Sequence, residues 1–170
     1  MAATAAGFIQ RGVRIIKVKL GKNAREDVER IRQIRQTVGP GIGLRIDANQ
    51  GWSYEDALYA LQAMGQYDIQ FCEQPMRHWN DHHLPVLKKQ SPIKIMADES
   101  VFDHHDAARL IAADACDYVN IKFAKSGGIA EAIKINQVCA DHKIPCMMGV
   151  CWKAGWRLPL LGILHWRMKM

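Results

Sequence analysis

Five strand-like runs in this sequence end in a charged residue, and these charges recur at nearly constant spacing. They are Lys19, Asp47, Glu73, Asp98 and Lys122, separated by 28, 26, 25 and 24 positions. Each interval has room for one helix, and parallel strands need a crossover of that kind. The spacing therefore predicts a parallel sheet whose strands carry charge at one common edge.

The segments between these charges indicate the same organisation. Helical patterns occupy residues 23–38, 53–64, 105–113 and 129–142; Gly39-Pro40 ends the first, and Ser53 is the expected N-cap of the second. The strand-like runs are IIKVK (15–19), LRID (44–47), IQFCE (69–73), IKIMAD (93–98), YVNIK (118–122) and IPCMMG (144–149). Alternation of this type predicts right-handed βαβ units in an α/β fold. We expect six strands, within residues 14–149, of a (β/α)₈ TIM-type barrel.

The charged strand ends predict a site. In a (β/α)₈ barrel the carboxyl ends of the strands surround one mouth, where active sites form. Three carboxylates at one mouth repel each other unless a cation lies among them, and an oxygen-only set of ligands favours Mg²⁺. We therefore predict that Asp47, Glu73 and Asp98 bind Mg²⁺.

The lysines on either side of these acids suggest acid–base chemistry. Lys17 and Lys19 share one face of their strand, because side chains alternate. A divalent cation and a second lysine lower the pKa of a lysine, which makes Lys19 a candidate general base and Lys17 a candidate substrate contact. Lys122 follows the three acids in the sequence, so it lies on the other side of them. With a metal-held substrate carboxylate, two such lysines can exchange an α-proton and produce a stereoisomer, or eliminate a β-leaving group.

Each residue also has an ordinary structural interpretation. An acid after a strand is often a helix cap or a turn residue, a lysine at a strand end often lies at the rim with its ammonium group in water, and Lys17 alone would fit a buried ion pair. The shared register of five charges favours the functional interpretation.

Composition narrows the classes of function. The net charge is +6, and residues 150–170 contribute four basic residues and no acid to it. The charges of the remaining residues are therefore nearly balanced, so we do not expect nucleic-acid binding. No apolar run is long enough to span a membrane. From the first residues we expect no signal peptide. The five cysteines show no paired or zinc-binding spacing, and the histidine clusters HWNDHH and DHHD are expected at the surface. We expect reduced thiols and a cytoplasmic protein.

The motifs KVK, DANQGW, CEQP, ADES and NIKFAKSGG, in this order, resemble the enolase superfamily. The resemblance covers roughly residues 5–149 and is to the muconate-lactonizing branch, most closely to dipeptide epimerases of the L-alanine-D/L-glutamate type. It implies that Asp47, Glu73 and Asp98 bind Mg²⁺, that Lys19 and Lys122 are the acid/base pair, and that Lys17 contacts substrate.

By this resemblance the activity is Mg²⁺-dependent epimerisation of a dipeptide through an enediolate. Muconate cycloisomerisation or o-succinylbenzoate synthesis, with the same lysines, is an alternative, and a non-catalytic truncated remnant is another. The expected partner is a small-molecule dipeptide, with no nucleic acid or membrane; a homo-oligomer is left open.

The sequence departs from the family at both ends. The family's capping domain and first strand have no counterpart before residue 14, and the eighth strand has none before Met170. We therefore expect residues 1–149 to be an incomplete barrel domain, about strands two to seven, and inactive alone.

We interpret residues 150–170 as an atypical tail, because they contain three tryptophans and show poor helical periodicity. An amphipathic docking tail is one interpretation. Another is a shifted reading frame: the codons of Val-Cys-Trp-Lys-Ala, read from the third base of the first codon, encode Leu/Met/Val-Leu-Glu-Ser/Gly. This resembles the Met-Leu-Glu-Ser type of ending common in the family's seventh strand, so we hypothesise the loss of a single base near codons 149–150.

Overall fold

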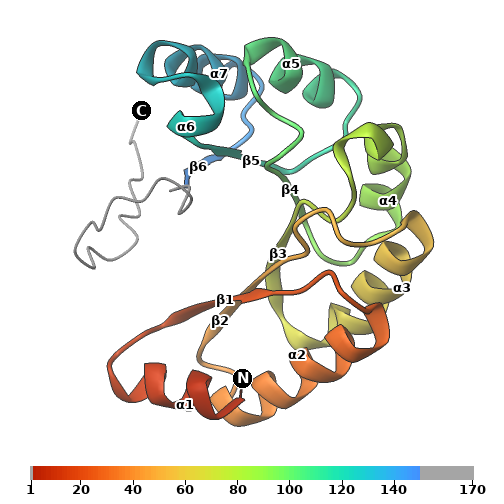
Figure 1. Cartoon of the computed structure of the whole chain (residues 1–170), viewed down its shortest axis with the longest axis vertical. Coiled ribbons are helices and arrows are strands. Elements are labelled where there is room, and N and C mark those ends of the chain that lie inside the picture. The colour runs from red at the N-terminus through yellow and green to blue at the C-terminus, as the bar shows by residue number, and fades with distance from the viewer. Residues whose placement is uncertain (1, 150–170) are drawn as a thin grey trace.

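A computed structural model describes residues 2–149 of the chain. Its strands and helices alternate in the predicted way (Figure 1). The strands are β1 (Ile15–Lys19), β2 (Gly43–Asp47), β3 (Ile69–Glu73), β4 (Ile95–Ala97), β5 (Tyr118–Ile121) and β6 (Cys146–Met148). The helices are α1 (Ala2–Gln10), α2 (Ala24–Val38), α3 (Tyr54–Met64), α4 (Leu84–Gln90), α5 (His104–Ala112), α6 (Phe123–Ser126) and α7 (Ile129–Asp141), with 3₁₀ turns η1 (Gly65–Tyr67) and η2 (His78–His83).

The six strands form one parallel sheet in the order β1-β2-β3-β4-β5-β6. Figure 1 shows the sheet curled, with α2, α3, α4, α5 and α7 on its convex side. A contact across the concave side agrees with this curvature, since Arg45 Nη1 of β2 lies 3.9 Å from Met147 Sδ of β6. In a flat sheet these strands would be about 19 Å apart, given roughly 4.8 Å per strand. The prediction of a partial (β/α)₈ barrel is confirmed.

The core lies between the sheet and the outer helices. Alternate strand residues such as Leu44, Ile46 and Val119 point outward and are fully buried. Their partners on the helices include Ile31, Leu61, Leu110 and Ile135, each at most 1% exposed. The outward face of each strand is therefore apolar, which leaves the concave face for polar side chains.

Helix caps fix where two of the crossovers begin. Asn23 caps α2 by accepting hydrogen bonds from the backbone of Arg25 and Glu26, and Ser53 Oγ accepts one from Asp56 N at 3.1 Å, as predicted. A cap of this type stabilises a helix by about 1 kcal/mol. Because each cap follows a strand closely, it also sets the length of the loop at the mouth.

In residues 2–149 no helix combines the length and the apolar character needed to cross a membrane. The predicted tail, residues 150–170, lies outside the described residues.

Candidate functional site

The register of the strands brings the predicted acids to one edge of the sheet. Lys19, Asp47 and Glu73 are direct neighbours across β1, β2 and β3. Between β3 and β4 the pairing shifts, so that Glu73 faces Met96 and Asp98 comes two residues later, just past the end of β4. Lys122 likewise follows the last residue of β5. The five charges therefore follow the carboxyl edge of the sheet in chain order.

The three carboxylates are fully buried, with no exposed surface, and each contacts a lysine. Lys17 Nζ lies 2.8 Å from Asp47 Oδ2 and 2.5 Å from Glu73 Oε2, so it bridges these acids. Lys19 Nζ lies 2.5 Å from Asp47 Oδ2. Buried carboxylates need such countercharges, because an unpaired charge loses its hydration without compensation.

The other side of the cluster has its own lysine. Lys122 forms an ion pair with Asp98 Oδ2, and its ammonium lies 4.0 Å from Glu73 Oε1. Glu73 is therefore the central acid: Lys17 contacts one of its oxygens, and Lys122 approaches the other. The structure brings together all six predicted site residues.

The pKa values reflect this crowding. Burial and the neighbouring charge of Asp47 raise the pKa of Glu73 to about 7. Burial alone would lower the pKa of Lys122, but its hydrogen bond to Asp98 and the charge of that carboxylate raise it above 10.5. The same balance, with Glu73 and Asp47 as partners, raises the pKa of Lys17. The carboxylates therefore dominate the surroundings of Lys17 and Lys122.

Sequence reasoning missed two polar neighbours of these acids. Asn120 Nδ2 donates to Glu73 Oε1 at 3.0 Å, while its own buried Oδ1 has no partner among the described residues. Lys125, three residues past Lys122, forms an ion pair with Asp98 Oδ1 at 2.8 Å. Both residues belong to NIKFAKSGG, so the motif pointed to this segment, although only the assembled sheet shows which acids they contact.

A third missed residue, Gln74, ties two strand ends together. Its Oε1 accepts hydrogen bonds from Asp98 N at 2.9 Å and Ser100 N at 3.2 Å, and its Nε2 donates to Ser100 Oγ at 2.7 Å and Met76 O at 2.9 Å. The side chain is 1% exposed. It fixes the segment of Asp98 against the end of β3, and its place in CEQP beside Glu73 was the signal.

The donor set suits Mg²⁺ in type, although its side chains do not converge in this arrangement. Asp47, Glu73 and Asp98 supply only carboxylate oxygens, the ligands that a hard cation prefers. No group of three or more His, Cys, Asp or Glu side chains within residues 2–149 is spaced closely enough to hold a metal ion. The lysine ammonium groups contact the carboxylates instead.

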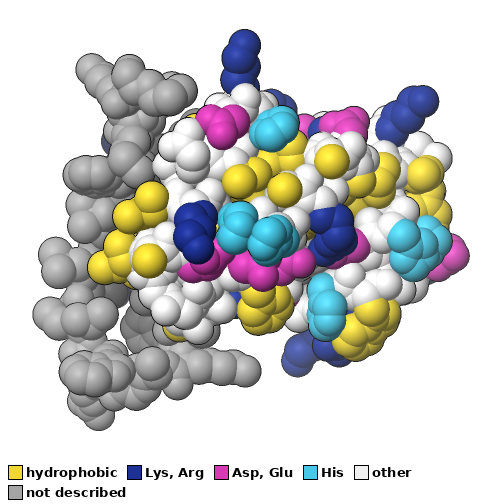
Figure 2. Space-filling model, turned by 90° about the horizontal axis from the view of Figure 1, so that it is seen from above, with side chains coloured by type: hydrophobic (Ala, Val, Ile, Leu, Met, Phe, Trp, Pro, Cys, Tyr) yellow, Lys and Arg dark blue, Asp and Glu magenta, His cyan; other side chains and the backbone are white. Residues whose placement is uncertain are grey.

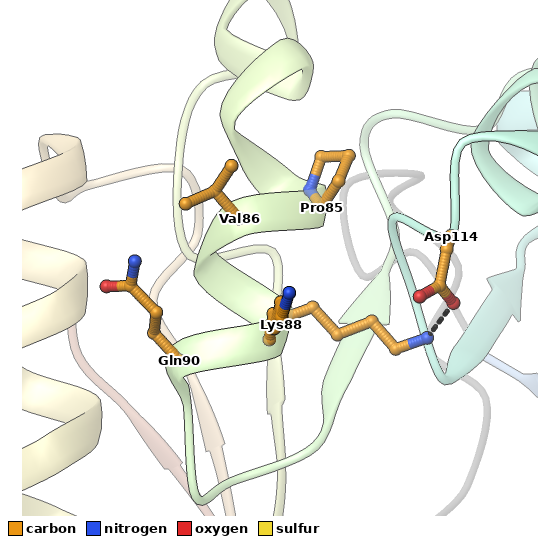
Figure 3. Close-up of a pocket in the computed structure, with 6 residues that line it drawn as sticks. Pro85, Val86, Lys88, Gln90 and Asp114 are labelled. Carbon is orange, nitrogen blue, oxygen red and sulfur yellow. Dashed lines mark hydrogen bonds and ion pairs between the residues drawn. The ribbon is translucent and has the colours of Figure 1, made fainter.

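Other polar regions lie apart from this cluster. Figure 2 shows histidine, acidic and basic side chains intermixed on one face of the molecule. His104, on α5, contacts Glu131 of α7 through both its backbone N–H, at 3.0 Å, and its ring. A pocket beside α4 is lined by Pro85, Val86, Lys88, Lys89, Gln90 and Asp114 (Figure 3). It is on the helical exterior and includes none of the predicted site residues.

Comparison with known proteins identifies the family. The family described as "Enolase C-terminal domain-like" matches residues 1–167. The chain belongs to the enolase C-terminal domain-like family. This membership confirms the resemblance to the enolase superfamily that the motifs suggested.

The most similar members of this family include dipeptide epimerases. The chain is 42% identical over 149 residues to a hydrophobic dipeptide epimerase of Enterococcus faecalis, covering 88% of this chain and 42% of that protein. It is 40% identical over 151 residues to an L-Ala-D/L-Glu epimerase of Clostridium acetobutylicum, with 88% and 42% covered. The chain thus spans about two fifths of the length of these relatives.

A solved structure shares this part of the enolase-type barrel. It is the dipeptide epimerase of Cytophaga hutchinsonii complexed with Mg and the dipeptide D-Ala-L-Val, and it matches with a TM-score of 0.87 and 44% identity over 88% of this chain and 41% of that one.

Proposed function

We propose that this chain forms part of the barrel of a Mg²⁺-dependent isomerase that epimerises a dipeptide. Asp47, Glu73 and Asp98 are the metal-binding residues in this proposal, Lys19 and Lys122 are the acid/base pair, and Lys17 contacts substrate. The similarity to dipeptide epimerases, one of them complexed with Mg and a dipeptide, supports the class of reaction.

One observation carries the assignment of roles. Lys19 contacts Asp47, and Lys122 contacts Asp98, so the two lysines lie on opposite sides of Glu73 along the strand ends. A substrate carbon held over the central carboxylate would have an ammonium group on each side. Two bases on opposite sides of one carbon are what an inversion of configuration requires, because one removes the proton and the other returns it.

The side chains fit the metal by donor type and by charge. When bound, Mg²⁺ would stabilise the negative charge that develops on the substrate carboxylate as the α-proton leaves. The protein's own groups supply the rest. Asp47, Glu73 and Asp98 would hold the cation, and their burial between strands fixes their positions. Lys17 already has its ammonium group between the carboxylates of Asp47 and Glu73.

The two lysines need opposite protonation states in this reaction. In one direction of the reaction Lys122 is the protonated group that donates a proton. Lys19 has to be neutral to remove a proton from the opposite side. Its side chain is 59% exposed, so it has access to both substrate and solvent. For the other stereoisomer the roles are exchanged.

The remaining proposals concern the whole protein. The substrate is a small dipeptide, and the cellular location is the cytoplasm, in keeping with the four free cysteines among the described residues. Residues 1–149 make up the barrel portion. Residues 150–170 form a separate tail, for which a shifted reading frame stays our hypothesis, and sequencing the locus tests it.

Isotope exchange tests the two-base proposal. The longest protein encoded at the locus would be incubated in D₂O with Mg²⁺ and either L-Ala-L-Glu or L-Ala-D-Glu, and NMR would follow loss of the α-proton of glutamate. Lys19→Ala should abolish exchange from one isomer and spare a measurable rate from the other, and Lys122→Ala should show the opposite preference. Equal loss from both isomers in each variant contradicts the assignment. Lys22→Ala, an exposed lysine in the same loop, is the control.

A further inference from the structure

A buried aspartate outside the carboxylate cluster joins the loops that carry it. Asp27 lies in the first turn of α2 and has no exposed surface. Its Oδ2 accepts two hydrogen bonds, from Gly21 N at 2.8 Å and from Trp52 Nε1 at 3.1 Å, and its Oδ1 pairs with Arg30. Both donors to Oδ2 lie beyond the carboxyl ends of strands, so one carboxylate oxygen connects two loops of the mouth.

These two loops carry proposed site residues. Gly21 comes two positions after Lys19, and Trp52 comes five positions after Asp47. The indole of Trp52 is 3% exposed, and its backbone N–H donates to Pro75 O at 3.2 Å, which extends the connection to the loop after β3. Asp27 thus links the end of β1 to the end of β2 and, through Trp52, to the loop after β3.

The contact between the two loops is close enough to require glycine. Gly21 has φ +97°, and a Cβ there would lie 2.0 Å from the carbonyl oxygen of Ala48. A Cβ on Gly51 would lie 2.0 Å from the carbonyl oxygen of Gly21. Leu20 N also donates to Asp47 O at 2.8 Å. Because the two backbones are in direct contact, the loop after β1 can adopt few conformations. The hydrogen bond to the Asp27 carboxylate stabilises one of them.

A role in packing alone does not account for a charge here. Asp27 shares the inward face of α2 with Ile31, Ile34 and Val38, where an apolar residue would avoid the cost of burying a carboxylate. Its two hydrogen bonds instead satisfy a backbone N–H and an indole N–H that fix the direction of the loop. Charged acceptors form shorter and stronger hydrogen bonds than neutral ones.

We propose that Asp27 is a positioning residue that sets the orientation of Lys19 at the mouth through Gly21 and Trp52. This inference rests on the proposed role of Lys19 as one of two bases. Lys122 is on the far side of the cluster, on a loop that Asp27 does not contact. Loss of Asp27 should therefore impair proton transfer on the Lys19 side more than on the Lys122 side.

The test uses the same D₂O exchange with L-Ala-L-Glu and L-Ala-D-Glu. Asp27→Ala should slow exchange from the isomer that depends on Lys19 by roughly 10- to 100-fold, the scale for a catalytic group misplaced by about 1 Å, and affect the other isomer less. Asp27→Asn keeps an oxygen that can accept from Gly21 and Trp52, so this variant should retain most of the parent's exchange rate from the isomer that depends on Lys19. Arg30→Ala, which removes only the pairing to Oδ1, is the matched control and should leave the ratio of the two exchange rates unchanged.

Trp52→Phe provides a second probe, which removes one hydrogen bond and keeps the packing, in case Asp27→Ala does not fold. It should shift the ratio of rates in the same direction. If Lys19→Ala shows its isomer preference but Asp27→Ala, or Trp52→Phe in its place, slows both isomers equally, the positioning role is wrong while the two-base proposal stands. If Lys19→Ala itself shows no preference, the proposed function fails first.

Discussion

At the scale of single residues, the site depends on buried carboxylates that need positive partners. Asp47, Glu73 and Asp98 have no exposed surface, and lysines offset part of their charge. Removing one partner of a buried ion pair costs about 3–5 kcal/mol, because a charge is left without compensation. A bound cation would offset the same charge, so the lysines and the metal compete for the same oxygens.

The metal assignment can be tested at Glu73. Glu73→Gln removes one negative charge but keeps an oxygen near Lys17 and Asn120, so we expect the fold to persist and Mg²⁺ affinity to fall by at least about tenfold, or ~1.4 kcal/mol. Isothermal titration calorimetry measures the affinity, and Glu55→Gln on the exposed first turn of α3 is the control. An unchanged affinity in Glu73→Gln would exclude this residue as a ligand.

Residues with a local signature could be predicted from the sequence, whereas residues defined by distant contacts could not. The acids and lysines end strands, which is visible in the sequence. Lys125 meets Asp98 across 27 positions, and Asn120 meets Glu73 across 47, so only the assembled sheet shows these pairs. Asp27 had a local signal that was overlooked, because it falls on the apolar stripe of α2 with Ile31.

At the scale of helices and strands, the prediction was accurate where the pattern was long. All six strands and helices α2, α3, α5 and α7 form where expected, although β4 and β6 are only three residues each. Helices α1, α4 and α6 were missed. The last two have seven and four residues, too short to show a periodic pattern, although Pro85 in the first turn of α4 is a typical start signal.

The contact between α5 and α7 predicts a pH dependence of stability. Hydrogen bonds from the ring and backbone of His104 lower the pKa of Glu131 from 4.5 to about 2. A carboxyl group with a lowered folded-state pKa stabilises the fold above its unfolded pKa, and this contribution disappears as the pH falls from about 4.5 to about 2.

Glu131→Gln should therefore lower the urea midpoint of unfolding at pH 7, with a difference from the parent that shrinks below pH 4.5. Parallel unfolding curves between pH 7 and pH 3 measure this. Glu55→Gln, which removes an exposed carboxylate, should show a much smaller change with pH. A difference for Glu131→Gln that is the same at pH 7 and pH 3.5 would contradict the assignment.

At the scale of the whole molecule, the described sheet is open. Within residues 2–149, β1 and β6 each pair with one neighbour and not with each other. A barrel closes when its last strand pairs with its first, and open strand edges favour aggregation.

We therefore propose that the 170-residue chain alone is not a competent enzyme. The chain and the longest reading frame that includes it would be expressed in parallel and assayed for dipeptide epimerisation with Mg²⁺. We expect turnover only from the longer protein, and light scattering should show association of the shorter one. Comparable turnover from a monomeric 170-residue chain would refute this proposal.

The most direct test of the whole account is deuterium incorporation by the longest protein encoded at the locus. It would be incubated in D₂O with a panel of L,L-dipeptides that includes L-Ala-L-Glu, with Mg²⁺ or with EDTA, and NMR and chiral chromatography would follow the products. The account predicts deuterium at one α-carbon, accompanied by inversion there, with Mg²⁺ and neither change with EDTA. Failure of a folded, Mg²⁺-binding protein to exchange an α-proton in any dipeptide of the panel would contradict it.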